Sequence, residues 1–145
     1  MTDLSKSLIS IEAPIADVQK ALFELDKYPE WSSQIKSAEA LARDDQGRIT
    51  KVKMSIDAGM MKDRPVLDYD WSQAPIKLSF SLDEANLLTG MDGVYTITAI
   101  DDDTTEVTYE LGVTLSMAVP AMMRQKAEKA TIDAALAQLK AHLEA

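Results

Sequence analysis

The sequence has no cysteine and a single histidine, His142. A chain without thiols forms no disulfide and offers no thiolate, and one histidine supplies neither a nucleophile–base pair nor a soft metal site. We therefore predict no catalytic residue, no metal and no cofactor, and we expect His142 to be a solvated residue in the last helical turn. The absence of cysteine also fits a reducing compartment, so we expect a cytoplasmic protein.

Positive charge is also scarce, because 15 Lys and Arg face 24 Asp and Glu and the net charge is −9. Binding to phosphate backbones or to anionic lipid needs a basic surplus, so nucleic acid is not an expected partner. No apolar run approaches the roughly 18 residues of a membrane span, and the first residues lack the pattern of a signal peptide. We expect no stable membrane insertion, and we interpret the acidity as an aid to solubility.

Internal repeats, low-complexity segments and linkers are absent, so the 145 residues predict one domain over 1–145. Residues 7–11 indicate a short strand that Pro14 ends. Residues 15–25 have helical spacing, and a second short helical turn is expected after Pro29.

Alternating apolar and polar residues then predict a meander of six antiparallel strands. The alternation is clear in residues 49–58, where Val52, Met54 and Ile56 share one face. The predicted strands are residues 35–42, 49–58, 65–72, 76–82, 93–100 and 105–115.

Residues 118–144 hold no glycine and are rich in strong helix formers, which predicts a single helix of about 40 Å. Its second half carries one apolar stripe, made of Ile132, Leu136, Leu139 and Leu143. Traced toward the N-terminus, the stripe changes character at Lys129, Gln125 and Met122. The far half is therefore expected to pack tightly and the near half to face a less uniform space. Lys129 either lines that space or reaches solvent along its stem.

A half-buried meander needs cover on its apolar face, and the long helix is the element able to supply it. The expected fold is α+β: a curved antiparallel sheet of about seven strands around the C-terminal helix, with two short helices after the first strand.

The loops at the two ends of this sheet differ in chemistry, because connections in a meander alternate between the ends. One end receives the polar turns 43–48, 72–75 and 101–104, and the other receives 59–62, 84–91 and 116–120. The last of these leads into Met122 and Met123, so that six of the eight methionines fall at this second end. Flexible methionine suits a cavity mouth, although the same residues could pack as a minor core or form a dimer interface. The predicted mouth residues are Met60, Met61, Leu87, Leu88, Met91, Met117 and Met123.

Several short motifs stand out along the chain: residues 9–14 (ISIEAP) with Val18, 25–31 (LDKYPEW), 69–71 (YDW), 93–95 (GVY) and 107–109 (VTY). Together they resemble the START-like superfamily, in particular its polyketide cyclase/dehydrase and coenzyme-Q-binding branch. The resemblance implies the helix-grip fold, with an apolar cavity between sheet and helix. It also implies a small apolar ligand, because members bind sterols, lipids, quinones, polyketides or hormones and some are cyclases.

The expected cavity residues lie on the inward strand faces and on the helix, whereas Arg64 has the parity of an outward residue. Tyrosine and tryptophan there either orient a ligand through one polar tip or simply pack in the core. The predicted set is Met54, Ile56, Leu67, Tyr69, Trp71, Phe80, Tyr95, Tyr109, Leu111, Met122, Gln125 and Lys129.

Three functions fit these features. The first is non-enzymatic binding or transport of a small hydrophobic molecule such as a lipid, quinone, polyketide or sterol-like compound. The second is a cyclase or dehydratase acting on a polyketide-like substrate in the same cavity. The third is a protein-interaction module that uses the methionine-rich end, including a weak homodimer.

Overall fold

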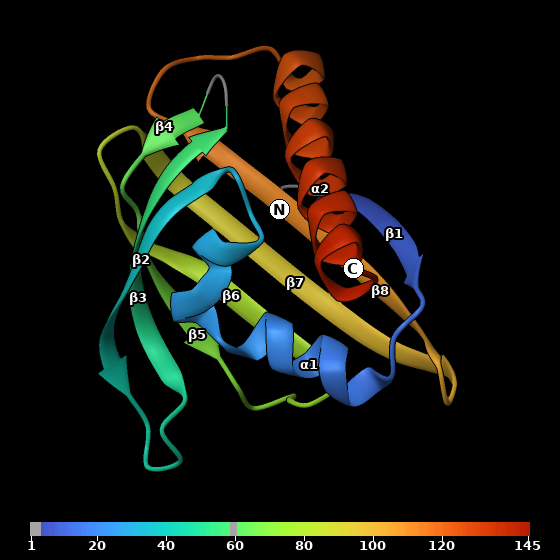
Figure 1. Ribbon diagram of the computed structural model, residues 1–145. Helices are drawn as coiled ribbons and strands as arrows, with labels where there is room; N and C mark the ends of the chain where they lie inside the picture. Colours follow the sequence, from blue (N-terminus) through green and yellow to red (C-terminus); the bar gives the residue numbers. More distant parts are fainter. Residues whose placement is uncertain (1–3, 59–60) are drawn as a thin grey trace.

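The computed structural model describes residues 4–58 and 61–145, and its centre is a strongly curved antiparallel sheet (Figure 1). The strands are β1 (Ser5–Ile11), β2 (Ile35–Arg43), β3 (Ile49–Ala58), β4 (Met61–Asp63), β5 (Val66–Asp70), β6 (Lys77–Glu84), β7 (Leu88–Asp101) and β8 (Thr104–Leu115). The helices are α1 (Ile15–Phe23), the 3-10 helix η1 (Leu25–Glu30) and α2 (Ala121–Leu143).

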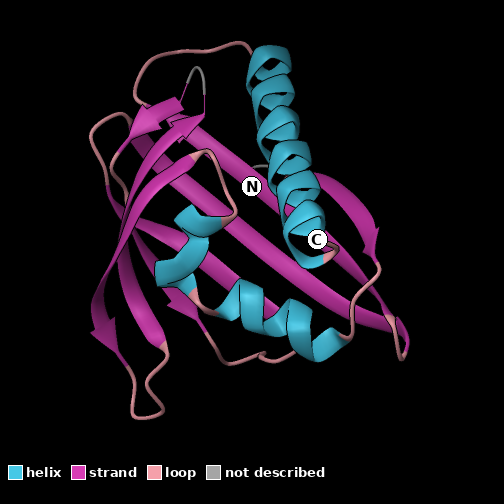
Figure 2. Cartoon of the chain, in the orientation of Figure 1, coloured by secondary structure: helices cyan, strands magenta, loops and turns pink. Residues whose placement is uncertain are grey.

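The order of strands across the sheet is β1-β8-β7-β6-β5-β3-β2, and all described pairs are antiparallel. The six predicted strands therefore form the expected meander, and β1 pairs with β8 so that Leu8 lies opposite Thr108. β4 was not predicted, because it is a three-residue strand that overlaps the end of the expected loop 59–62 and pairs with the end of β3. The α+β helix-grip architecture is confirmed (Figure 2).

The longest strands carry the alternation that the sequence predicts. In β8, Val107, Tyr109 and Leu111 are buried on the concave face. β7 begins earlier than expected, at Leu88 instead of Gly93, because its first residues pair with the end of β8, where Leu88 lies opposite Leu115. That pairing partner is distant in the sequence, so local alternation did not reveal it.

The short helices cover the lower part of the concave face (Figure 2). Val18 and Leu22 of α1 are buried, and the Tyr28 hydroxyl of η1 donates a hydrogen bond of 2.6 Å to the Leu22 carbonyl. The second helical turn was expected after Pro29, which is wrong: η1 contains Pro29 and ends at Glu30.

Helix α2 lies across β1 and β8 on the concave side (Figure 1). Ile132, Leu136 and Leu139 are buried as the stripe predicts. Within residues 4–58 and 61–145, no helix combines the length and apolar character needed to cross a lipid bilayer.

Candidate functional site

A cavity of about 40 Å³ lies between the concave sheet face, η1 and α2. At roughly 10–15 Å³ for each enclosed water, this space has room for about three water molecules. Its wall is formed by Tyr28, Trp31, Ser32, Gln34, Ile35, Met54, Ile56, Leu67, Tyr69, Phe80, Met91, Tyr95, Tyr109, Thr131 and Ala135. Every one of these side chains is uncharged at neutral pH.

The structure brings seven of the predicted cavity residues together in this wall. They come from five neighbouring strands whose inward faces converge under the helix: Met54, Ile56, Leu67, Tyr69, Phe80, Tyr95 and Tyr109. Period-2 alternation placed them correctly, since it decides which face of a strand a residue occupies.

Trp71 and Leu111 were also predicted to line the cavity, but both are buried elsewhere in the core. Trp71 packs edge-on against Phe23 at 5.3 Å between ring centroids, and its indole Nε1 donates a 2.8 Å hydrogen bond to the Ile49 carbonyl. The Arg48 guanidinium lies 5.4 Å from the centre of the same ring. This residue therefore closes the polar-loop end of the core.

The three predicted helix residues, Met122, Gln125 and Lys129, do not line the cavity. All three are exposed, Met122 at 81%. The Lys129 Nζ donates a 2.7 Å hydrogen bond to the carbonyl of Lys6 on β1, so it takes the solvent-facing alternative.

The residue that α2 buries in place of Lys129 is Glu128, with 0% exposure. Its carboxylate accepts hydrogen bonds from the Val113 backbone N–H at 2.7 Å, the Ser5 hydroxyl at 2.7 Å and the Arg124 guanidinium at 2.8 Å. Among the described residues, the pairing of β1 with β8 ends at Ser5 opposite Leu111, and the Val113 N–H lies beyond this last pair. The sequence analysis did not identify Glu128, because it searched for apolar residues. Positions 128 and 129 both lie about one helical turn before Ile132, so spacing alone does not say which of them is buried.

The predicted mouth residues divide into two groups. Leu87, Met117 and Met123 are exposed, whereas Leu88 is buried and Met91 lines the cavity. Met60 and the side chain of Met61 lie outside the described residues.

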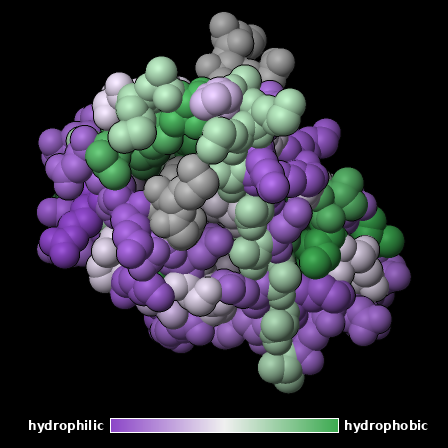
Figure 3. All heavy atoms as spheres, turned by 90° about the horizontal axis from the view of Figure 1, so that it is seen from above, coloured by the Kyte–Doolittle hydropathy of each residue, from purple (hydrophilic) through white to green (hydrophobic). Residues whose placement is uncertain are grey.

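Leu87, Met117, Met122 and Met123 form what we call the apolar end, where β8 leads into α2. Figure 3 looks down on this end and shows green hydrophobic atoms gathered there. The Ser116 backbone N–H donates to the Leu87 carbonyl at 3.0 Å, so two of the loops meet as the alternation of connections predicted.

Asp63 holds one of these loops in place. Its buried carboxylate accepts hydrogen bonds from the backbone N–H groups of Arg64, Asn86, Leu87 and Leu88 at 2.7–3.0 Å. Burial disfavours the charged carboxylate, but these four donors outweigh burial and hold the pKa of Asp63 below its usual value.

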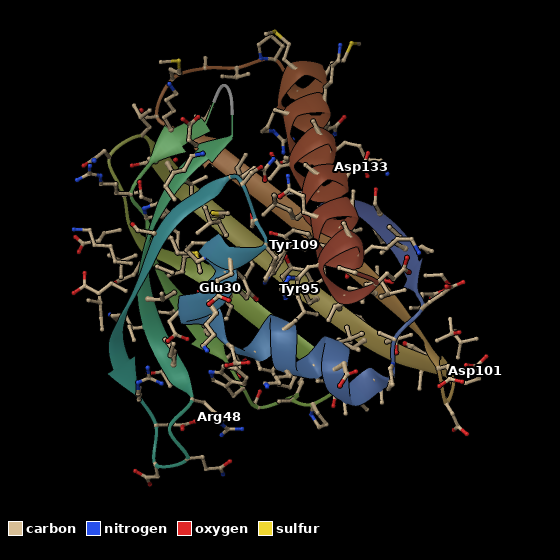
Figure 4. All side chains as sticks on the ribbon, viewed as in Figure 1. Glu30, Arg48, Tyr95, Asp101, Tyr109 and Asp133 are labelled. Carbon is tan, nitrogen blue, oxygen red and sulfur yellow. The ribbon has the colours of Figure 1, made fainter. Side chains whose placement is uncertain are left out.

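All four tyrosines of the chain line the cavity. Tyr95 and Tyr109 stack with ring centroids 4.1 Å apart and an angle of 15°, and Figure 4 shows them between the sheet and the helices, away from Asp101 and Asp133 at the periphery. Tyr69 packs against Phe80 at 5.2 Å. Burial raises the pKa of each hydroxyl, so all four stay neutral at physiological pH and act as hydrogen-bonding groups, not as bases.

The Phe80 ring lies directly over Gly93 of the adjacent strand. A Cβ at position 93 would stand 2.2 Å from Phe80 Cζ, so glycine is what allows the ring to occupy this place in the cavity wall. Gly90 of the same strand is less crowded, since a Cβ there would first meet Thr114 Oγ1 at 3.3 Å.

Sequence reasoning missed the part of the wall that comes from η1, the segment after it, the first residue of β2 and α2. These residues are Tyr28, Trp31, Ser32, Gln34, Ile35, Thr131 and Ala135. The aromatic residues of the motif at 25–31 were a usable signal, because two large rings in an irregular segment must be buried somewhere.

A family model described as "Polyketide cyclase / dehydrase and lipid transport" matches residues 11–140. No curated protein sequence matches the chain.

Solved structures share its fold at low sequence identity. A START superfamily protein from Mycobacterium smegmatis has a TM-score of 0.93 at 18% identity, over 99% of this chain and 98% of that one. The Zhui aromatase/cyclase from Streptomyces sp. R1128 has a TM-score of 0.79 at 13% identity, over 97% and 93%. The di-domain ARO/CYC BexL from the BE-7585A biosynthetic pathway has a TM-score of 0.80 at 15% identity, over 99% of this chain and 47% of that one.

Proposed function

The chain belongs to the START-like polyketide cyclase, dehydrase and lipid-transport family, and on that premise we propose that it binds a small, uncharged hydrophobic molecule in the cavity under α2. The observation that carries this proposal is the chemistry of the wall. Its fifteen side chains are apolar, aromatic or neutral and polar. Such a lining suits a neutral ligand, which loses little hydration when it enters.

The same wall favours binding over acid–base chemistry. Its titratable groups are the four tyrosines, and burial keeps them protonated at neutral pH. A general base works best with a pKa near the operating pH, which these hydroxyls do not have. We therefore favour a carrier or binding protein over an enzyme.

Ligand entry requires side chains to move, because the cavity of about 40 Å³ is smaller than most organic molecules. Met54 and Met91 in the wall are suited to this, since unbranched thioether side chains repack easily. We propose the apolar end as the route of entry, because its four exposed apolar side chains offer a hydrophobic molecule a first contact with the protein.

Native mass spectrometry after incubation with a lipid extract tests the proposal. Ala135→Leu adds three carbons to the cavity wall, and Ala137→Leu adds the same atoms on the exposed face of α2. We expect the wild type and Ala137→Leu to retain a ligand and Ala135→Leu to retain much less, with circular dichroism as the check on folding. A wild-type protein that acquires no ligand, or equal retention by both variants, would contradict binding in this cavity.

A cyclase or dehydratase is the second candidate, because the tyrosine hydroxyls around one small cavity could hold the carbonyl and enol groups of a polyketide. Two proteins with this fold are named aromatase/cyclase or ARO/CYC. Incubation with a synthetic poly-β-keto thioester separates the candidates: a product that has lost water would favour the enzyme, and unchanged thioester would favour the carrier.

The apolar end also supports the third candidate, a protein-interaction surface or weak homodimer, since exposed apolar patches mark such surfaces. Gel filtration over a range of concentrations tests self-association. A constant elution volume would argue against the homodimer.

A further inference from the structure

Trp31 lines the cavity, and its buried indole N–H has no hydrogen-bond partner among the described residues. It follows η1 in the chain, is 9% exposed, and packs against Tyr28 with ring centroids 5.0 Å apart. Among the described residues, its Nε1 is the single buried side-chain nitrogen or oxygen that has no hydrogen bond. Buried indole N–H groups usually donate a hydrogen bond, so an unpaired one in a cavity wall suggests an acceptor that the protein itself does not supply.

Two other buried donors near the cavity are satisfied within the protein. The second tryptophan, Trp71, donates its Nε1–H to the Ile49 carbonyl, and the Tyr28 hydroxyl donates to the Leu22 carbonyl. The core therefore supplies acceptors for these two donors. Among the described residues it supplies none for the buried N–H of Trp31.

Two neutral polar residues follow Trp31 closely in the chain, Ser32 and Gln34, and both line the wall. Met54, Leu67 and Phe80 give the same wall apolar contacts. A ligand that fills the cavity would thus meet polar groups as well as apolar side chains.

We propose that the Trp31 Nε1–H is a specificity-determining donor and that the ligand carries a neutral hydrogen-bond acceptor, such as a ketone, quinone or ester carbonyl. This inference rests on the proposed function and narrows it from any hydrophobic molecule to carbonyl-bearing ones. The acceptor is neutral because the described residues of the wall include no cation to balance a carboxylate or a phosphate. The stacked Tyr95 and Tyr109 rings and the Tyr69–Phe80 pair favour a flat ring system beside that carbonyl.

Trp31 also borders a second hollow, an outer groove between α1, η1 and the end of α2 whose rim includes Asp17, Lys20 and His142. A water molecule in that groove is the competing acceptor for the indole N–H. If water satisfies it, the protein should not distinguish a ketone from the matching hydrocarbon.

The test uses two probes of nearly equal shape, 1-tetralone and tetralin, which differ by one carbonyl oxygen. We expect the wild-type protein to bind 1-tetralone about tenfold more tightly, the effect of one neutral hydrogen bond formed by an otherwise unpaired donor. Trp31→Phe should reduce this preference to within about twofold. Trp71→Phe is the matched control and should keep the tenfold preference, because Trp71 lies outside the cavity wall.

A second measurement does not depend on how Trp31→Phe folds. The chain has two tryptophans, so the indole N–H region of a ¹⁵N-correlation spectrum contains two signals, and Trp71→Phe assigns them. We expect 1-tetralone to move the Trp31 signal downfield and tetralin to leave its hydrogen-bond-sensitive proton shift nearly unchanged.

Equal affinity of the wild type for both probes, or a preference that survives Trp31→Phe, would overturn the inference and leave the proposed function standing. Failure of the wild type to bind either probe or any molecule of a lipid extract would overturn both.

Discussion

Replacing Glu128 with alanine should destabilise the protein far more than replacing Asp133 with alanine. Both carboxylates lie on α2 and both accept a 2.7 Å hydrogen bond from a serine hydroxyl of β1, Ser5 for Glu128 and Ser7 for Asp133. The difference between them is burial, since Glu128 is fully buried and Asp133 is exposed (Figure 4). The pair therefore isolates the effect of burial on one helix-to-strand contact.

The expected loss of unfolding free energy for Glu128→Ala follows from the groups that would no longer be hydrogen-bonded. The Val113 N–H would lose its acceptor in a buried position, and the Arg124 guanidinium, with 18% of its side chain exposed, would lose its counter-ion. Breaking a buried ion pair from one side costs roughly 3–5 kcal/mol, and the partial exposure of Arg124 points to about 3 kcal/mol. The loss for Asp133→Ala should lie within the small range of surface substitutions.

Urea unfolding monitored by circular dichroism measures both variants. We expect a lower midpoint with an unchanged slope for Glu128→Ala and a nearly wild-type curve for Asp133→Ala. Glu128→Gln should fall between them, because an amide oxygen can still accept from Val113 but carries no charge for Arg124. Equal midpoints for the two alanine variants would refute the reasoning that burial of Glu128 anchors the first half of α2.

Three further predictions concern the cavity and its rim. Gly93→Ala should destabilise the protein by about 1–3 kcal/mol and reduce ligand retention, because the added Cβ would overlap the ring of Phe80 in the cavity wall. Gly90→Ala is the control and should have neither effect. Similar urea midpoints for the two variants would contradict this prediction. Asp63→Asn should lower the free energy of unfolding at pH 7, and the difference from wild type should narrow as the pH falls below about 4. The pKa of Asp63 is lower in the folded than in the unfolded protein, so the carboxylate stabilises the fold at a pH above its unfolded pKa, and this stabilisation is lost as the pH falls through its folded pKa. A difference in unfolding free energy that stays constant down to about pH 3 would count against this prediction. Met117→Glu and Met123→Glu should slow ligand uptake in stopped-flow measurements without changing the unfolding midpoint, and unchanged uptake rates would remove the apolar end as the entry route.

The strand pattern was predictable because it depends on local alternation. Six strands and their order as a meander follow from residues that neighbour one another in the chain, and the same alternation placed Tyr69, Tyr95 and Tyr109 on the inward face. The short strand β4 and the early start of β7 were missed, because both exist through pairing with strands elsewhere in the sheet.

The orientation of α2 was predictable only in part. Three buried leucine and isoleucine positions identify the inward face of the second half of α2. The first half of α2 meets the end of β8, beyond the described pairs of β8 with β1, and there the Glu128 carboxylate accepts the hydrogen bond of the Val113 N–H. A search for apolar stripes does not identify Glu128, because glutamate is charged. Its burial becomes favourable through the hydrogen bonds from Val113 and Arg124, which only the tertiary structure shows.

The sequence by itself determined the class of fold, the apolar end and most of the inward strand faces, because these depend on residue type and spacing along the chain. Only the tertiary structure decided the size of the cavity and the isolation of the Trp31 N–H. Both depend on how closely side chains from η1, α2 and six strands approach one another, and close packing between distant segments leaves no periodic trace in the sequence.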